Sequence, residues 1–352
     1  MRKRRLELTI WAFALSLAYY PAFLGFLAWI SLIRPIMIIA KLKGREAFNA
    51  AYFFSFFFNA FSLYWVIPVT PPGAIMAIVI VAFYYTAVLC IFNVIYRWRP
   101  AVGMVALPFL WVGMEYFRTL SQFAFPWSDL GYTQSYYLYI LQIVSVISVH
   151  GLSLLIVAVN VLLWQVLRRE LSPERRLTSV FASLAVVVAL LAYGWVVTPP
   201  FPKPGTYPVA LLQGSVPIDI KWELENEGYS IKLYDSLTQT VKDTTVRLYV
   251  WPESAVPCYL TDDMYCRTMV SDIARKSRAY HLVGGLALTR VDTSRHAFNS
   301  CFQFNPQGRI EQRYDKMKLV PFSEQPPYQD YLPFLKRDFL TKYLTLIEKY
   351  NV

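Results

Sequence analysis

Residues 177–205 decide how this chain is organised. Residues 177–197 read LTSVFASLAVVVALLAYGWVV, and after Thr198 the sequence continues PPFPKPG at 199–205. The first stretch is apolar and within the roughly 17 to 25 residues that a helix needs to cross a bilayer. The second is rich in proline and predicts a stiff linker. Long apolar blocks precede this junction, whereas charged residues recur every few positions after it.

The apolar part of the chain predicts a polytopic membrane domain. The whole sequence of 352 residues is 56% hydrophobic and 16% charged, far from the average soluble protein. The basic start at residues 2–5 also fits a secretory signal, but no small-residue cleavage site follows it, so we expect an uncleaved first span. Seven candidate spans lie at about 6–20, 22–40, 46–67, 73–96, 101–119, 137–166 and 176–197.

The positive charge indicates topology rather than a nucleic-acid partner. The net charge of +11 divides into +9 for residues 1–200 and +2 for the remainder. In the apolar half, 13 of the 15 Lys and Arg residues lie in alternate connections, at 2–5, 41–45, 97–99 and 168–176. Because basic residues favour the cytoplasmic side, we expect a cytoplasmic N-terminus and a second domain beyond the membrane. No nucleic-acid binding is expected.

The part after the linker predicts an α/β domain. Strands are expected at 209–213, 248–251, 282–288 and 299–304, with helices at about 224–243 and 262–279. This alternation is typical of a layered α/β fold. The expected organisation is therefore a transmembrane domain at 1–198, a linker at 199–206 and a second domain at 207–352.

The four cysteines and three histidines show no zinc-binding spacing. Cys90 lies inside an apolar block and is most simply a small apolar residue. Cys258 and Cys266 are either a disulfide, if the second domain faces an oxidising compartment, or two buried thiols. No metal or organic cofactor is expected.

Three charged positions in the second domain are candidates for chemistry. Glu253 follows the apolar strand 248–251 and lies between two prolines, while Lys316 and Glu324 flank an apolar turn. In one α/β site, Glu253 and Lys316 would supply a base and a fixed cation. Each also has a simple structural interpretation: Glu253 as a solvated loop residue, and the other two as surface charges that pair weakly.

Two motifs resemble those that carry the glutamate and the lysine of the nitrilase superfamily. The first is Trp251-Pro252-Glu253-Ser254, and the second runs from Tyr314 through Lys316 and residues 319–322 to Glu324. Their form is similar to that of the apolipoprotein N-acyltransferase family. Further landmarks agree in order along nearly the whole chain: Leu63-Tyr64-Trp65, Phe125-Pro126-Trp127, Gly131-Tyr132-Thr133-Gln134, Gly151-Leu152-Ser153, and residues 209–213 followed by Gly214 and Lys221-Trp222.

The resemblance implies a bacterial inner-membrane acyltransferase with about seven spans and an αββα nitrilase-like sandwich outside the cytoplasm. Such enzymes move an acyl chain from a phospholipid to the N-terminal diacylglyceryl-cysteine of a lipoprotein, through a thioester on a cysteine. By motif, Glu253 would be the general base, Lys316 would stabilise the oxyanion and Glu324 would support the site. Trp222, Trp127 and Arg118 match positions near the active-site mouth that contact lipid. Their simple interpretation is interfacial anchoring.

The family's nucleophile is not found. In the family it follows the lysine motif by some tens of residues, but no cysteine of this sequence follows Cys301. Cys258 matches no nucleophile position in the superfamily pattern. The expected explanation is a truncated acyltransferase whose sandwich is incomplete. A non-catalytic lipid-binding relative and a membrane-tethered amidase of the same superfamily are the alternatives.

Overall fold

The computed structural model describes residues 2–20, 23–68, 71–120, 122, 124–168, 170–198, 207–221, 227–242, 245–291, 294–320, 328 and 331. They form two compact units, one built from residues up to 198 and the other from residues 207–319. The expected linker lies between them, outside the described residues. The domain limits of 1–198 and 207–352 stay a prediction.

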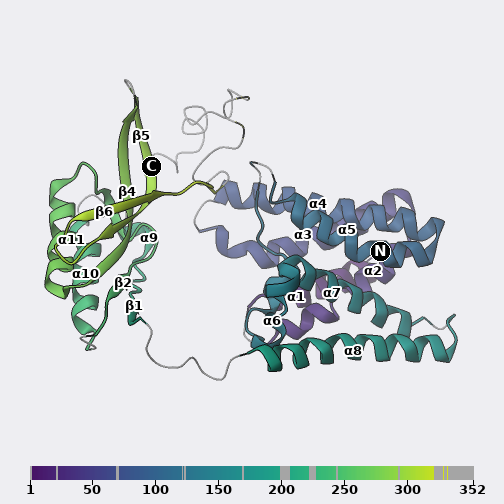
Figure 1. The fold of residues 1–352 in the computed structure, drawn as a ribbon. Helices are drawn as coiled ribbons and strands as arrows, with labels where there is room; N and C mark the ends of the chain where they lie inside the picture. The colour runs from purple at the N-terminus through teal and green to yellow at the C-terminus, as the bar shows by residue number, and fades with distance from the viewer. Residues whose placement is uncertain are drawn as a thin grey trace. The chain divides into compact units, whose positions relative to one another are not determined.

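The first unit is helical and contains a counterpart for every expected span (Figure 1). Proline begins α5 and α8, where its missing N–H is no loss, and the Ser172 side chain caps α8 by accepting from the backbone N–H of Arg175. The helices are α1 (Arg2–Leu17), α2 (Ile33–Ala40), α3 (Gly44–Leu63), α4 (Pro71–Trp98), α5 (Pro100–Phe117), α6 (Leu138–Leu141), α7 (Val144–Val166) and α8 (Pro173–Val197).

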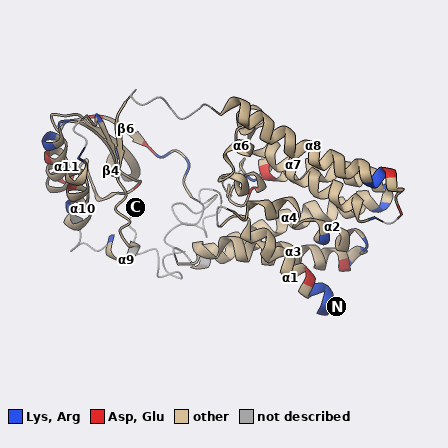
Figure 2. Cartoon of the chain, turned by 90° about the horizontal axis from the view of Figure 1, so that it is seen from below, with Lys and Arg blue, Asp and Glu red and all other residues tan. Residues whose placement is uncertain are grey.

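Four described helices, within α4, α5, α7 and α8, are long and apolar enough to cross a membrane. The chain is therefore a membrane protein. The other expected spans are shorter or more polar: α1 has 16 residues, which span about 24 Å, and the 22–40 block contains the apolar segment Gly25–Ala40. The count of seven stays a prediction. Figure 2 shows Lys and Arg gathered at one end of this unit, at the start of α1 and between α7 and α8.

The segment Gly25–Ala40 is broken, and buried side-chain amides satisfy its backbone. A 3-10 turn at Gly25–Trp29 precedes α2. Asn160 of α7 donates to the carbonyl of Ala28 at 2.8 Å and accepts from the N–H of Leu32 at 3.0 Å. Since no water reaches such groups in an apolar bundle, each unpaired one would be costly. The amide of Asn160 thus allows a helix break inside the bundle.

The second unit is a mixed sheet with two helices packed on it (Figure 1). Among the described residues the strand order is β1-β2-β4-β5-β6, with β3 pairing with β4. The pairs β1–β2, β2–β4 and β3–β4 are parallel, whereas β4–β5 and β5–β6 are antiparallel. The elements are β1 (Val209–Leu211), α9 (Ile218–Lys221), α10 (Glu227–Thr240), β2 (Leu248–Val250), β3 (Val256–Tyr259), α11 (Met264–Ser277), β4 (Tyr280–Val291), β5 (Ser294–Phe304) and β6 (Ile310–Asp315).

The four expected strands and two expected helices of this unit are present, and two strands were not expected. β3 contains Pro257, which weakens a strand pattern. β6 is mostly exposed and reads IEQRYD, without the apolar alternation that predicts a strand. Both depend on pairing with strands that are distant in sequence, which local periodicity does not reveal.

We expect Asn160→Leu to destabilise the helical unit. The substitution leaves the N–H of Leu32 and the carbonyl of Ala28 buried without their partner, at about 1 to 3 kcal/mol for each group. Thermal unfolding of the detergent-solubilised protein, followed by circular dichroism, measures the loss. The control is Gln142→Ala, which removes one exposed bond to the carbonyl of Leu138. Equal melting temperatures for the two variants would contradict this account of the break.

Candidate active site

A tight turn at the end of β2 presents Glu253. The N–H of Trp251 continues the sheet by donating to Leu282 at 2.9 Å, and the N–H of Ala255 closes the turn on the carbonyl of Pro252 at 3.3 Å. Gly284 of β4 lies directly against this turn. A Cβ at position 284 would be 2.2 Å from the carbonyl oxygen of Pro252 and 2.8 Å from the Cα of Glu253. The carboxylate therefore requires glycine beneath it.

The structure brings Glu253 and Lys316 together, as the motifs predict. The Nζ of Lys316 lies 2.9 Å from the Oε1 of Glu253, and the Nδ2 of Asn299 donates to the same oxygen at 2.5 Å. The pair is partly open, because the Lys316 side chain is 27% exposed and that of Glu253 is 60% exposed. A carboxylate with an adjacent ammonium, open to a substrate, is suited to base catalysis with oxyanion stabilisation.

The β5–β6 ladder places Lys316. β6 ends at Asp315, which pairs with Ser300, and the N–H of Lys316 then donates to the carbonyl of Asn299 at 2.9 Å. Burial alone raises the pKa of the Asp315 carboxyl, but hydrogen bonds from Arg313 at 2.7 Å and Ser300 at 2.6 Å outweigh it and hold that pKa below its ordinary value. A charged Asp315 thus fixes the end of the strand just before the lysine.

A buried polar contact supports the Glu253 turn from below. The indole of Trp251 stacks on Tyr234 at 4.7 Å and donates from Nε1 to the Nδ1 of His281 at 3.1 Å. The other ring nitrogen of His281 lies 2.8 Å from the hydroxyl of Ser277. Burial lowers the pKa of His281 to about 4, so its ring is neutral at neutral pH and accepts the hydrogen bond from the indole N–H.

Sequence reasoning missed Asn299 and Lys221. Burial lowers the pKa of Lys221, the last residue of α9, although the charge of nearby Glu253 opposes this. Lys221 was quoted only as a family landmark beside Trp222, and Asn299 only as the start of an expected strand. Neither residue type at its position indicates a catalytic role, because each comes near Glu253 only in the folded unit.

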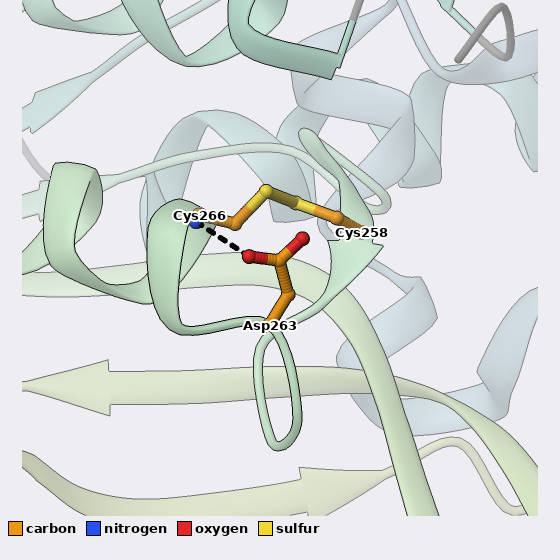
Figure 3. A group of neighbouring side chains, drawn as sticks. All are labelled: Cys258, Asp263 and Cys266. Atoms are coloured by element: carbon orange, nitrogen blue, oxygen red, sulfur yellow. Dashed lines mark hydrogen bonds between the residues drawn. A yellow bond between two sulfur atoms is a disulfide. The ribbon is translucent and has the colours of Figure 1, made fainter.

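The cysteines settle one question that the sequence left open. Cys258 of β3 and Cys266 of α11 form a disulfide with an S–S distance of 2.01 Å (Figure 3). The nearby carboxylate of Asp263 caps α11 by accepting from the N–H of Cys266 at 2.9 Å. Because its sulfur is bonded, Cys258 is neither a nucleophile nor a metal ligand. Cys301 of β5 pairs with Gly284 of β4. It is a free, half-buried thiol, and burial raises its pKa.

Trp127 belongs to an aromatic groove in the helical unit. Its ring stacks on Trp65 at 4.2 Å and on Phe125 at 5.5 Å, and it remains 42% exposed. The groove has a volume of about 400 Å³, and its lining includes Tyr19, Tyr20, Trp65, Trp127 and Tyr132. An open aromatic groove of this size suits an apolar chain or an interfacial group.

Arg118 is buried inside the helical unit. It is 2% exposed, forms an ion pair with Asp129, donates to the carbonyl of Trp127 at 3.1 Å, and lies 5.2 Å from the ring centre of Tyr85. These contacts fix the backbone that carries Trp127. The expected lipid contact of Arg118 stays a prediction. The remaining expected site residues, Trp222 and Glu324, lie outside the described residues.

The fold and the Glu–Lys pair define a membrane-bound protein with a nitrilase-like unit. Comparison with known proteins identifies its family. Residues 11–162 match the apolipoprotein N-acyltransferase N-terminal domain, and residues 208–342 match the carbon-nitrogen hydrolase family. The chain belongs to the apolipoprotein N-acyltransferase family of the nitrilase superfamily.

Individual relatives of this chain are named apolipoprotein N-acyltransferase. An apolipoprotein N-acyltransferase of Geobacter metallireducens is 32% identical over 88% of this chain, and one of Chlorobaculum tepidum is 27% identical over 88%. In both cases the match covers 62% of the relative. The chain therefore spans about three fifths of the length of these relatives.

We expect acid to destabilise the second unit through His281. Its folded pKa of about 4 lies below the value of about 6.5 for an unfolded chain, so the stability that its neutral ring provides is complete above pH 6.5 and lost as the pH falls toward 4. Unfolding should cost about 2 kcal/mol less at pH 5 than at pH 7 on this account. Denaturant unfolding at the two pH values measures the difference.

His281→Phe should remove this part of the pH dependence, whatever it does to stability at pH 7. His296→Ala, which removes an exposed histidine of β5, should retain it. A pH dependence unchanged in His281→Phe would overturn the assignment.

Proposed function

We propose that this protein is part of an N-acyltransferase that moves an acyl chain from a phospholipid, such as phosphatidylethanolamine, to the N-terminal diacylglyceryl-cysteine of lipoproteins. The observation that carries the proposal is the 2.9 Å contact between Glu253 and Lys316 in a nitrilase-like unit that follows a membrane domain. Names of relatives support the reaction class. A membrane domain suits it, because acyl chains at about 0.8 kcal/mol per buried CH₂ do not leave the bilayer for a soluble site.

In the proposed mechanism, Glu253 removes the proton of a cysteine thiol, and the thiolate attacks the ester carbonyl of the phospholipid. Lys316 stabilises the tetrahedral oxyanion. The C–O bond then breaks, and the lysophospholipid leaves with the proton from Glu253. In the second half, Glu253 takes a proton from the attacking lipoprotein amine, and the thioester C–S bond breaks to restore the thiolate. Within residues 1–352 no cysteine follows Lys316, so the thiol is assigned to no residue of this chain.

Asn299 has a positioning role in this proposal. Both described bonds to the Glu253 carboxylate go to Oε1, one from Lys316 and one from Asn299. The proton transfers are accordingly assigned to Oε2. Glu324, by the family motif, supports the same site.

The lipid contacts are proposed for Trp127, Trp222 and Arg118, and Arg118 also has a positioning role. Trp127 forms part of the wall of the aromatic groove, which would accept acyl chain or the lipid's interfacial region. Arg118 acts through the carbonyl of Trp127 and through Asp129.

The proposed topology has seven spans in the inner membrane, a cytoplasmic N-terminus and an extracytoplasmic second unit. Two independent observations support it. Basic residues gather at one end of the helical unit (Figure 2). The disulfide between Cys258 and Cys266 suits an oxidising compartment such as the periplasm.

Glu253→Gln and Lys316→Met should each lower the transfer rate by about 100-fold or more, since a general base and an oxyanion donor contribute about that much. The assay is restoration of lipoprotein N-acylation by the complete gene product in cells depleted of their own enzyme. Glu311→Gln, on the exposed strand β6, is the matched control and should restore it fully. Restoration by Glu253→Gln would refute the mechanism.

Cys258 and Cys266 should resist alkylation until a reductant is added. Whole cells are denatured and then treated with a thiol reagent, with or without prior reduction, and peptides are identified by mass spectrometry. Denaturation before alkylation ensures access, and Cys301 serves as the free-thiol control. Alkylation of both cysteines without reductant would contradict the disulfide and the oxidising location together.

A further inference from the structure

A second cluster of chemistry-bearing side chains lies inside the helical unit, where α5 ends. Glu115 comes from α5, Asp129 from the connection that follows it, and His150 from α7. One ligand atom from each residue lies within 4.8 Å of the other two. The two carboxylates are almost completely buried, with 0% of Glu115 and 1% of Asp129 exposed.

The atoms that face one another lack hydrogen-bond partners among the described residues. These are Oε2 of Glu115, Oδ2 of Asp129 and Nδ1 of His150. The Nδ1 atom lies 3.9 Å from Oε2 and 4.0 Å from Oδ2. Such distances exceed a hydrogen bond, but two ligands of one metal ion can be up to about 4.2 Å apart when each bond is about 2.1 Å. Both distances from His150 fit two ligands of one ion, and the ligand atoms of the two carboxylates lie within 4.8 Å of each other.

The opposite oxygen of each carboxylate is already held. Oε1 of Glu115 accepts from the indole of Trp111 at 3.0 Å and from the N–H of Leu130 at 2.9 Å. Oδ1 of Asp129 pairs with Arg118. Outer contacts of this kind orient the ligands of metal sites. They also leave the orphaned oxygens pointing toward His150.

The charges of the buried groups also favour a bound cation. When both buried carboxyls are ionised they face one buried guanidinium, and the remaining negative charge is strongly destabilising unless a proton or a second cation neutralises it. An additional cation at the orphaned atoms removes this cost. The imidazole ligand makes an ion that accepts nitrogen more suitable than calcium or magnesium, which prefer oxygen alone.

We propose that Glu115, Asp129 and His150 bind a divalent ion of the zinc or manganese type. The ion joins α5, the connection that carries Trp127, and α7, and so holds the aromatic groove in shape. The His150 side chain is 23% exposed, which gives the ion a path of entry. The proposed ion takes no part in the acyl-transfer steps assigned to Glu253 and Lys316.

The test is metal content of the purified protein. The full chain is solubilised in detergent, incubated with Zn²⁺ or Mn²⁺, dialysed, and analysed by mass spectrometry of the elements. We expect about one ion per chain, and a loss of more than about tenfold in affinity for His150→Ala. The control His296→Ala should bind as the unmodified chain does. With Co²⁺ as the probe, visible absorption bands should appear and should depend on His150.

A second measurement covers the case in which Glu115→Gln fails to fold. His150 is partly exposed, so His150→Ala is the main variant, and its folding is checked by circular dichroism. A chelator should lower the melting temperature of the unmodified chain and leave that of His150→Ala unchanged. Two results would overturn the proposal. The first is that the unmodified chain retains no ion, in which case a proton on one carboxyl neutralises the cluster. The second is that His150→Ala retains as much metal as the unmodified chain. Neither depends on transferase activity.

Discussion

The contact of Glu253 with Lys316 is the constraint on which the candidate site of the second unit depends. It joins the turn after β2 to the end of β6 across the sheet, and it is possible only because Gly284 lets the turn lie against β4. As a partly exposed ion pair it contributes little to stability, about 0 to 1 kcal/mol. The surrounding framework of Asn299, Asp315 and the Trp251–His281 contact nevertheless holds it in one place. Because the pair adds little stability, its fixed position agrees with the catalytic role proposed for it.

The first unit obeys a different constraint, because polar groups inside an apolar bundle must find partners. The amide of Asn160 meets this requirement for the broken segment Gly25–Ala40, and Arg118 meets it for the connection that carries Trp127. Among the described residues, one atom each of Glu115, Asp129 and His150 lacks a hydrogen-bond partner, and the proposed metal site rests on these atoms. The need to pair buried polar groups thus accounts for the contacts beside the aromatic groove and motivates the proposed metal site.

The sequence predicted the parts of the fold that have local signals. The lengths of the hydrophobic stretches located the helices α4, α5, α7 and α8. The apolar pattern also located the strand Leu248–Val250, which precedes the Pro252-Glu253 turn of the candidate site. It did not predict β6, whose exposed residues lack alternation and which forms only by pairing with β5. The contact between Glu253 and Lys316 came from the family motifs, because 63 residues separate them and no periodicity connects them.

Other parts of the site arise only from tertiary structure. Asn299 reaches Glu253 through the register of β5, and the partners of Arg118 lie 9 and 11 residues away in an irregular connection. The sequence therefore placed Arg118 at the surface, as a lone basic residue between spans, whereas the structure buries it. Similarly, Glu115, Asp129 and His150 have no ligand spacing that a sequence motif would detect. Their proximity follows from helix packing alone.

The most direct test of the central claim is a measurement of products. The complete gene product is reconstituted with phosphatidylethanolamine and a diacylglyceryl peptide, and separately with short amides. If Glu253 and Lys316 form an acyl-transfer site, lysophospholipid and N-acylated peptide should accumulate in equal amounts. Ammonia release from the amides without any lysophospholipid would contradict the claim and identify a membrane-tethered amidase instead.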